Sequence, residues 1–357
     1  MAQAPSASAR LAGSAPVVTI VEETTSNTEV RLVSRPGELA MAHLELANSP
    51  MPEPGDGQIL VRNRWLSVDN YVRGRMDDIP EPAYTPFQLG MPLDGGAIGE
   101  VIESRSPAVP AGASVLHFLG WREYAVVDAD AALVVDTDLA PPQAYLGVLG
   151  IPGLAAYAAL TEVARIEAGE IVFISAAAGP IGSVAGQIAR ELGASTVIGA
   201  AGGPTDVLTV LDHYGFDMVL DHDLGAVGQQ LNRIAPDGID VYLDSVGGQL
   251  LESAIDALRP GGRAVLVRAA SMCNAHHPVP GPSNLLKVID KQLTVRGMRV
   301  ASYLDMFPEY VRRAVKWFAD DVPLGNEPVV EGIEHGVAAL VGLVRGARPG
   351  KIVVHLP

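Results

Sequence analysis

The stretch Ile171-Val-Phe-Ile-Ser-Ala-Ala-Ala-Gly179-Pro-Ile-Gly182 decides the fold class of this chain. An apolar run typical of a buried strand leads into small residues and then into a helix pattern over 181–192. Read against the dinucleotide-binding pattern G-x-G-x-x-G, it matches from Ala177 onward, with Ala in the first position. Gly179 would let the backbone approach a pyrophosphate, and Gly182 would let the helix pack closely on the strand. The alternative is a tight turn without a ligand, but the strand–helix units that follow favour dinucleotide binding.

Strand and helix patterns alternate after this turn. Strands are expected at 195–200, 218–220, 241–243 and 263–268, and helices at 208–214, 225–234 and 248–258. An Ala/Leu-rich helical segment, 142–163, precedes them and is interrupted by Pro152-Gly153. This alternation is typical of a doubly wound parallel sheet. The sequence therefore predicts an α/β fold with a Rossmann domain over 141–321.

The first part of the chain has a different pattern, with short strands separated by Gly and Pro turns. They are expected at 58–63, 99–103, 114–118 and 124–127, which favours a small barrel or sandwich. A final strand at 351–355 could return to this part. We therefore assign 17–140 and 322–357 to one β-rich domain and 1–16, rich in Ala and Ser, to a tail that is no signal peptide.

Composition excludes several classes of function. The net charge of −16 over 357 residues argues against a nucleic-acid or anionic-membrane partner. One cysteine, Cys273, excludes an internal disulfide and any multi-cysteine zinc site. No stretch of 18 apolar residues is present, so we expect no membrane span and a cytoplasmic protein.

Residues at the end of the second strand of the nucleotide fold determine whether NAD or NADP binds. NAD enzymes place an acid there, about 20 residues after the glycine turn. Here the segment reads Gly199-Ala-Ala-Gly-Gly203 and has no acid, which leaves room for a 2′-phosphate. No Lys or Arg follows nearby, and Asp206 has the wrong charge for a phosphate. NADPH is favoured over NADH.

Several further segments together carry a family resemblance. The chain resembles the zinc-independent leukotriene B4 dehydrogenase/prostaglandin reductase family of NADPH-dependent double-bond reductases, within the medium-chain dehydrogenase/reductase superfamily. The resemblance covers nearly everything from Val17 to the end and rests on Leu66-Ser-Val-Asp-Asn-Tyr-Val-Arg-Gly-Arg-Met76, Gly147-Val-Leu-Gly-Ile-Pro-Gly-Leu-Ala-Ala-Tyr157, Ser175-Ala-Ala-Ala-Gly-Pro-Ile-Gly-Ser183, Asp244-Ser-Val-Gly-Gly248, Pro280-Gly-Pro-Ser-Asn-Leu285 and Gly350-Lys-Ile-Val-Val354.

The resemblance implies a GroES-like β-barrel domain completed by the C-terminus, a Rossmann domain, and a homodimer. It implies hydride delivery from NADPH to an alkene conjugated to a carbonyl, on a small apolar substrate. The implied catalytic residues are Tyr71, Tyr157 and Cys273. The implied cofactor-binding residues are Ala177, Gly179, Pro180, Ile181, Gly202, Gly203, His222, Ser245, Val246, Ser271, Met298 and Arg348.

The chain departs from the family's pattern where that pattern binds the cofactor and the enolate. The family has Lys at Asp206, Tyr at His222, Asn at Ser245, Thr at Ala155 and Asn at Arg348. It has Tyr at Cys273, and that hydroxyl normally lies near the nicotinamide ribose and the enolate. Arg348 or Arg268 could supply the missing cation at the phosphate.

Other candidate groups favour structural roles. Four aromatic residues lie in segments that flank the family's cleft: Tyr71, Tyr84, Trp121 and Tyr157. Half-buried packing is the better interpretation of each one taken singly, and Tyr71 and Tyr157 are the best candidates to donate a hydrogen bond to a substrate carbonyl. Cys273 with His276 and His277 has no regular ligand spacing, so we predict no metal site. Asp69 and Arg73 are interpreted as a structural ion pair or cap.

Three functions remain open. The first is an NADPH-dependent ene reductase of bacterial secondary metabolism. The second is a biosynthetic reductive cyclase, in which loss of the proton-donating Tyr at Cys273 prolongs a carbanion that closes a ring, as in a polyene macrolactam. The third is a non-redox member of the fold, either a binding protein or a cofactor-independent cyclase.

Overall fold

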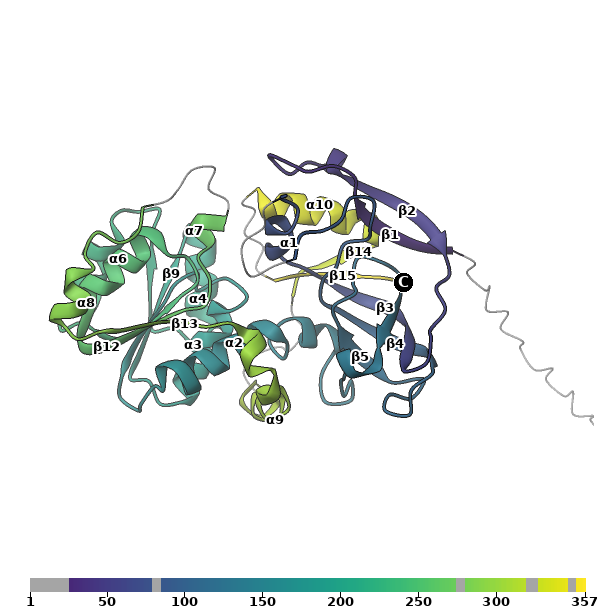
Figure 1. Ribbon diagram of the computed structural model, residues 1–357. Helices are drawn as coiled ribbons and strands as arrows, with labels where there is room; N and C mark the ends of the chain where they lie inside the picture. The colour runs from purple at the N-terminus through teal and green to yellow at the C-terminus, as the bar shows by residue number, and fades with distance from the viewer. Residues whose placement is uncertain (1–25, 79–84, 274–279, 319–326, 346–350) are drawn as a thin grey trace, which may run out of the picture.

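The computed structural model describes residues 26–78, 85–273, 280–318, 327–345 and 351–357 of the chain. It consists of two lobes (Figure 1). One lobe is a parallel sheet with helices on both faces, and the other is built mainly of antiparallel strands. The predicted combination of a Rossmann domain and a GroES-like β domain is confirmed.

The Rossmann lobe holds a six-stranded sheet in which every neighbouring pair is parallel. The strand order is β10-β9-β8-β11-β12-β13. The chain thus winds outward from β8 in one direction and then from β11 in the other, so that the order reverses between these two strands. The strands are β8 (Ile171–Ile174), β9 (Thr196–Ala201), β10 (Met218–Asp221), β11 (Ile239–Asp244), β12 (Leu258–Leu266) and β13 (Thr294–Gly297).

Helices cover both faces of this sheet, and their ends agree with the expected ranges to within a few residues. The helix after the glycine turn, expected at 181–192, is α3 (Gly182–Glu191). The others of this lobe are α4 (Pro204–His213), α5 (Val227–Ile234), α6 (Gly248–Ala257), α7 (Ala270–Cys273), α8 (Leu286–Asp290), η5 (Val300–Met306) and α9 (Phe307–Phe318).

The β lobe is organised around one long strand, β3 (Gln58–Val68), which was expected to end at residue 63. It pairs antiparallel with three neighbours, β4, β6 and β15. The larger sheet runs β14-β15-β3-β4-β5-β7, and β1 and β2 form a separate pair. The remaining strands are β1 (Ser26–Leu32), β2 (Leu44–Pro50), β4 (Ala97–Ser104), β5 (Ser114–His117), β6 (Tyr124–Asp128), β7 (Leu133–Val134), β14 (Val329–Glu331) and β15 (Ile352–His355).

The predicted return of the C-terminus is confirmed. Strand β15 pairs with β3, with Val353 opposite Ser67. Helix α10 (Ile333–Val344) packs on the same lobe, together with the short helices η1 (Met41–His43), α1 (Tyr71–Gly74) and η2 (Ala129–Ala131) (Figure 1). The predicted domain boundaries at residues 140 and 322 stay predictions, and the predicted 1–16 tail lies outside the described residues.

The Ala/Leu-rich segment joins the two lobes. It forms η3 (Pro142–Leu146), α2 (Ile151–Ala158) and a π-helical segment, η4 (Ala159–Ala164). Its side chains belong to a buried cluster that includes Leu116 of the β lobe and Ile174 of the Rossmann sheet. Gly153 allows α2 to approach α9, since a Cβ there would lie 2.0 Å from the Tyr310 hydroxyl. The lobes therefore share a continuous apolar core.

Candidate functional site

The glycine turn lies between β8 and α3, at the end of the sheet where the strand order reverses. In open α/β sheets, ligands bind outside the carboxyl ends of the strands at such a point. A Cβ on Gly179 would lie 3.0 Å from the carbonyl oxygen of Ala176, and one on Gly182 only 2.2 Å from it. Gly182 is therefore required for the start of α3 to pack against the end of β8, as the sequence predicted, whereas the predicted approach of a pyrophosphate to Gly179 stays a prediction.

The turn also carries backbone strain that the sequence did not reveal. Ala176 has a φ of +47°, in the left-handed region that non-glycine residues rarely adopt. Ala177 is fully buried and donates its N–H to Ala200 of β9. The N–H groups of Ala178 and Ile181 have no hydrogen-bond partner among the described residues. Two free donors beside a helix N-terminus suit the pyrophosphate of a dinucleotide.

A second turn lies beside the first, after β11. The Ser245 N–H donates to the Ser175 Oγ at 2.7 Å, which ties the end of β11 to the end of β8. The Val246 carbonyl accepts bonds from both the N–H and the Oγ of Ser271, at 3.0 and 2.6 Å. The structure therefore brings together Ser245, Val246 and Ser271, three residues that the family resemblance assigned to the cofactor.

Asp244 holds this second turn in shape. Its Oδ1 accepts from the N–H groups of Val246 and Gly247, each at 2.8 Å, and from the Tyr242 hydroxyl at 2.9 Å. The carboxyl group is fully buried, and burial raises its pKa although these backbone donors oppose the shift. Asp244 stands in the Asp244–Gly248 motif, but no local pattern in the sequence indicates that its carboxyl group holds the turn.

The predicted adenosine end of the site follows β9. Gly203 has a φ of +81°, precedes α4 and donates its N–H to Asp221 Oδ1 at 3.1 Å. The His222 N–H donates to the Ala201 carbonyl, and Asp206 lies in the first turn of α4. Gly202, Gly203 and His222 are therefore close together, but the neighbouring side chains include carboxylates.

The structure tests only one of the two arginines that were proposed to bind the 2′-phosphate. Arg348 lies outside the described residues. Arg268 follows β12, which is separated from β9 by β8 and β11. At about 4.8 Å per strand spacing, three spacings place Arg268 roughly 14 Å from the β9 end. Arg268 is thus too far along the sheet to replace the missing lysine, and that hypothesis is wrong.

Tyr157, expected near the reacting atoms, instead faces α9. It is 3% exposed, its hydroxyl donates to Glu309 Oε1 at 3.3 Å, and its ring packs against Tyr310 and Trp317. Burial raises the pKa of its hydroxyl. A side chain bonded and packed in this way stabilises the contact between α2 and α9, so the structure argues against a catalytic role.

The other implied catalytic residues keep their status as predictions. Tyr71 begins α1 and is half-buried against the core of the β lobe. Cys273 is the last residue of α7, and its side chain lies outside what the structure describes, as do Tyr84, His276 and His277. Trp121 packs in the core of the β lobe, as predicted, but it is fully buried rather than half-buried, and its Nε1 has no hydrogen-bond partner among the described residues.

The predicted pairing of Asp69 with Arg73 is wrong. Lys351 Nζ lies 2.5 Å from Asp69 Oδ1, and Arg73 pairs with Asp77 at 2.7 Å. The prediction paired Asp69 with Arg73 because they are opposite charges four residues apart. The actual partner of Asp69, Lys351, is distant along the chain and could not be recognised from local sequence.

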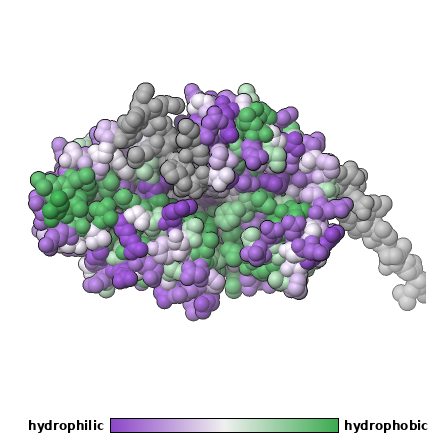
Figure 2. Space-filling model, viewed as in Figure 1, coloured by the Kyte–Doolittle hydropathy of each residue, from purple (hydrophilic) through white to green (hydrophobic). Residues whose placement is uncertain are grey.

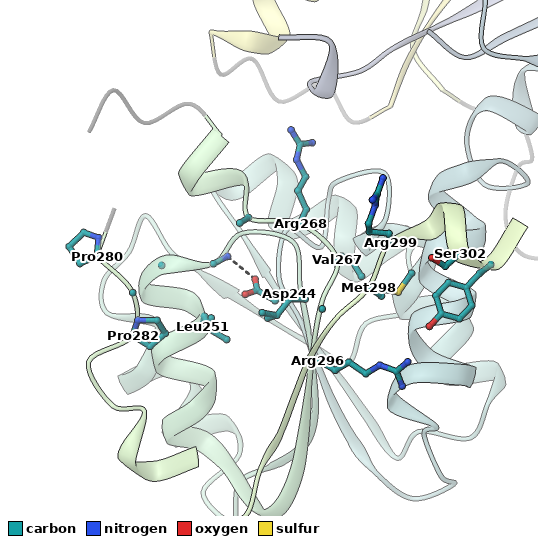
Figure 3. A pocket seen from close by; sticks show the side chains of 17 residues that line it. Asp244, Leu251, Val267, Arg268, Pro280, Pro282, Arg296, Met298, Arg299 and Ser302 are labelled. Atoms are coloured by element: carbon teal, nitrogen blue, oxygen red, sulfur yellow. Dashed lines mark hydrogen bonds between the residues drawn. The ribbon is translucent and has the colours of Figure 1, made fainter. Parts of the chain in front are cut away.

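A cavity of about 630 Å³ lies beside the second turn (Figure 3). It is lined from β11, α6, β12, β13 and η5, and of the residues implied to bind the cofactor it includes Met298 alone. Its lining includes parts of the Asp244–Gly248 and Pro280–Leu285 motifs, but a cavity between them could not be predicted because it forms only when these segments pack beside β12 and β13. Within the described residues, no three His, Cys, Asp or Glu side chains lie close enough to hold a metal ion.

Comparison with known proteins identifies the class. A family model described as the N-terminal domain of oxidoreductase matches residues 28–135, and one described as zinc-binding dehydrogenase matches residues 180–319. The solved structure of CurA from Vibrio vulnificus in complex with NADPH superposes with a TM-score of 0.84 and 30% identity, covering 92% of this chain and 99% of that one.

Curated relatives define the family more closely. The NADPH-dependent curcumin reductase of Escherichia coli is 33% identical over 91% of this chain and 95% of its own length. The NADP(+)-dependent 2-alkenal reductase of Nicotiana tabacum is 34% identical over 85% of this chain and 88% of its own. The chain therefore belongs to the zinc-independent leukotriene B4 dehydrogenase/prostaglandin reductase family of medium-chain reductases. It is an NADPH-dependent enzyme, as the sequence predicted.

Proposed function

We propose that the chain reduces the carbon–carbon double bond of an apolar α,β-unsaturated carbonyl compound with NADPH. One observation carries the proposal. The turns after β8 and β11 meet where the strand order reverses, and the Ser175–Ser245 hydrogen bond joins them. The relatives named above are reductases of such compounds.

The residues present fit NADPH. A Cβ on Gly179 would fill the space above Ala176, and the Ala178 and Ile181 N–H groups are free within the described chain to donate to a pyrophosphate. Ser245, Val246 and Ser271 would hold the nicotinamide end. When bound, the cofactor supplies a hydride from C4 of its nicotinamide.

The protein's own part is to position the substrate and to stabilise charge. Hydride addition at the β-carbon leaves negative charge on the carbonyl oxygen, and a hydroxyl or N–H donor close to that oxygen lowers the barrier. Tyr71 is our candidate donor, since it stands in the Leu66–Met76 segment and Tyr157 is engaged with α9.

The test is consumption of NADPH in the presence of a medium-chain 2-alkenal, with the product analysed by mass spectrometry. We expect a saturated aldehyde that is two hydrogens heavier than the substrate. With NADPH deuterated at C4, one deuterium should appear on the β-carbon. Tight NADPH binding without consumption on alkenals or enones would contradict the proposal.

The reductive cyclase of bacterial secondary metabolism stays a second proposal. It is motivated by Cys273, where the family has a Tyr that lies near the enolate. A substrate with a second, tethered unsaturated group distinguishes the cyclase from the ene reductase. A cyclase would form a ring from it, whereas an ene reductase would form an open-chain product. The non-redox proposal predicts that neither nicotinamide cofactor binds.

We also propose that the enzyme is a cytoplasmic homodimer, formed through β13. This edge strand is exposed along its whole length, and Leu286 and Ile289 of the neighbouring α8 are 67% and 72% exposed. Figure 2 shows apolar side chains gathered at the end of the Rossmann lobe where Figure 1 places α8. An unpaired strand edge beside an apolar patch is typical of an interface.

Light scattering during gel filtration tests this arrangement. Ile289→Asp should convert the dimer to monomers. Leu224→Asp, which alters a leucine that is 82% exposed beyond the opposite edge of the sheet, should leave the dimer intact. A monomer in the unaltered protein would refute the dimer.

No helix among the described residues is long and apolar enough to cross a membrane.

A further inference from the structure

Asn70 lies between strand β3, which ends at Val68, and helix α1, which begins at Tyr71. Strand β3 runs toward the Rossmann lobe, and α1 lies on the side of the β lobe that faces this lobe and helix α7 (Figure 1). Helix α7 carries Ser271, whose Oγ donates to the Val246 carbonyl in the turn after β11. The segment that carries Asn70 therefore faces the part of the Rossmann lobe to which we assign the nicotinamide.

The side chains on both sides of Asn70 are fixed by partners within the β lobe. The Asp69 carboxylate pairs with Lys351, and Arg73 pairs with Asp77 at 2.7 Å. The Asn70 carbonyl accepts the Arg73 N–H, so the backbone of Asn70 is held as well. The side-chain amide of Asn70, by contrast, forms no hydrogen bond with any described residue. The structure thus places an unused amide on a segment that is otherwise anchored.

The Oδ1 of Asn70 is a buried hydrogen-bond acceptor that finds no donor in the described part of the chain. An asparagine before a helix usually accepts a backbone N–H of the first turn. Asn70 has helical backbone angles, φ −63° and ψ −26°, and its side chain forms no such bond. A buried acceptor that loses water without gaining a donor destabilises a fold, and native proteins contain few of them. A ligand that brings a donor to Oδ1 would remove this cost.

The missing partner has to be a hydrogen-bond donor, and this requirement selects among the molecules of the reaction. An apolar unsaturated aldehyde or ketone has a carbonyl acceptor but no N–H or O–H group. The nicotinamide half of NADPH has two kinds of donor, the NH2 of its carboxamide and the hydroxyls of its ribose. A carboxamide also matches the asparagine side chain in either orientation, because each carries one acceptor oxygen and two N–H donors. The cofactor, rather than the substrate, therefore fits Asn70.

We propose that Asn70 binds the nicotinamide half of NADPH, with its Oδ1 accepting a hydrogen bond from the carboxamide NH2 or from a hydroxyl of the adjoining ribose. This bond would join the β lobe to a cofactor that is otherwise held by the Rossmann lobe. It would also fix the nicotinamide close to Tyr71, the candidate donor to the substrate. The inference rests on NADPH as the cofactor and not on the proposed reduction of an alkene.

The test compares three ligands by calorimetry, without any substrate. The first is NADP+. The second is its 3-acetylpyridine analogue, in which a methyl group replaces the carboxamide NH2. The third is 2′-phospho-ADP-ribose, which lacks the nicotinamide ring but keeps the hydroxyls of the ribose. The Kd of each ligand is measured for the unaltered protein and for Asn70→Leu, a substitution that keeps the approximate size of the side chain and removes both of its polar atoms.

Asn70→Leu should weaken NADP+ binding about tenfold, the effect of losing one hydrogen bond and leaving its donor unpaired. If the carboxamide is the donor, the substitution leaves the Kd of the 3-acetylpyridine analogue and of 2′-phospho-ADP-ribose unchanged. If a ribose hydroxyl is the donor, all three ligands bind about tenfold more weakly. Either result supports the proposal and identifies the group that Asn70 binds. Unchanged NADP+ binding in Asn70→Leu would overturn it.

Urea denaturation without cofactor separates a binding role from a structural one. Because Oδ1 has no partner among the described residues, Asn70→Leu should leave the free energy of unfolding unchanged or raise it. A lower free energy of unfolding would show that the fold already uses this amide, and the proposal would fail. Asn232→Leu is the matched control, because Asn232 is exposed on α5, and it should bind all three ligands like the unaltered protein.

These measurements also separate the inference from the proposed function, because none of them requires turnover. If NADP+ binding depends on Asn70 but no alkenal or enone is reduced, the proposed function fails and this inference stands. If alkenals are reduced and Asn70→Leu binds NADP+ like the unaltered protein, this inference fails and the proposed function stands.

Discussion

Lys351 reaches from the beginning of β15 to Asp69, which follows β3, and its Nζ lies 2.5 Å from the Asp69 Oδ1. The same ammonium group donates to the Ser67 Oγ. Lys351 is 8% exposed, so the ion pair is largely removed from water. The ion pair holds the C-terminal strand against the segment that carries Tyr71. Asp69 and Lys351 are 282 residues apart in the chain.

Removing one partner of this pair should destabilise the fold. Lys351→Met leaves the Asp69 carboxylate without its cation, and loss of one member of a buried ion pair costs about 3 kcal/mol. Urea denaturation followed by circular dichroism measures the change. Lys316→Met, at an exposed lysine of α9, is the control and should change the free energy of unfolding by less than about 0.5 kcal/mol. A loss as small as the control's would show that the pair contributes nothing.

His117 should make stability depend on pH. It is fully buried, its Nε2 bonds Asn63 Oδ1 at 2.8 Å and its Nδ1 accepts the Leu119 N–H, so it is neutral in the fold. Burial, followed by the charge of Arg122, lowers its pKa from 6.5 to about 3. Below pH 6.5 the unfolded chain takes up a proton that the fold excludes, and stability falls by about 1.4 kcal/mol per pH unit until pH 3.

The measurement is the free energy of unfolding at pH 7.5 and pH 5.0. The unaltered protein should lose about 2 kcal/mol more than His117→Gln over this interval. His335→Gln, at an exposed histidine of α10, should behave like the unaltered protein. Equal losses in the unaltered protein and in His117→Gln would contradict the buried neutral histidine.

The glycine turn should tolerate no larger side chain at Gly179. A Cβ there lies 3.0 Å from the Ala176 carbonyl oxygen, and the two methyl groups of Val would occupy the space where a pyrophosphate approaches the backbone. We expect Gly179→Val to weaken NADPH binding at least about tenfold, measured by nicotinamide fluorescence. Gly37→Val, where a Cβ meets nothing within 4 Å, should bind NADPH like the unaltered protein. Unchanged binding in Gly179→Val would place the pyrophosphate elsewhere.

Asp206 should weaken the preference for NADPH over NADH. It lies in the first turn of α4, directly after the Gly202-Gly203 turn, and Asp221 and Asp223 are close by. Asp206→Lys replaces repulsion of the 2′-phosphate by attraction, and it should tighten NADPH binding about tenfold with little change for NADH. Asp212→Lys, in the last turn of the same helix, controls for net charge. Equal tightening of both cofactors would show that Asp206 does not face the 2′-phosphate.

The parts predicted from sequence are those set by neighbouring residues. Strand β8, the turn through Gly179 and helix α3 follow from an apolar run, small residues and a helical pattern within a dozen positions. The strand ends at Ala201 and Asp244 were placed to within a residue or two by the same rule. Family resemblance then supplied the cofactor and the reaction class.

Tertiary structure decided the partners of individual side chains. Tyr157 and Glu309 are 152 residues apart in the chain, and Asp69 and Lys351 are 282 apart, so no local pattern pairs them. The cavity beside the turn after β11 is lined by segments that meet only because β11, β12 and β13 lie side by side. The α/β class, the glycine turn and the family follow from the sequence alone, because local propensity and short motifs specify them. The roles of Tyr157 and Lys351 depend on contacts that form only when distant segments pack.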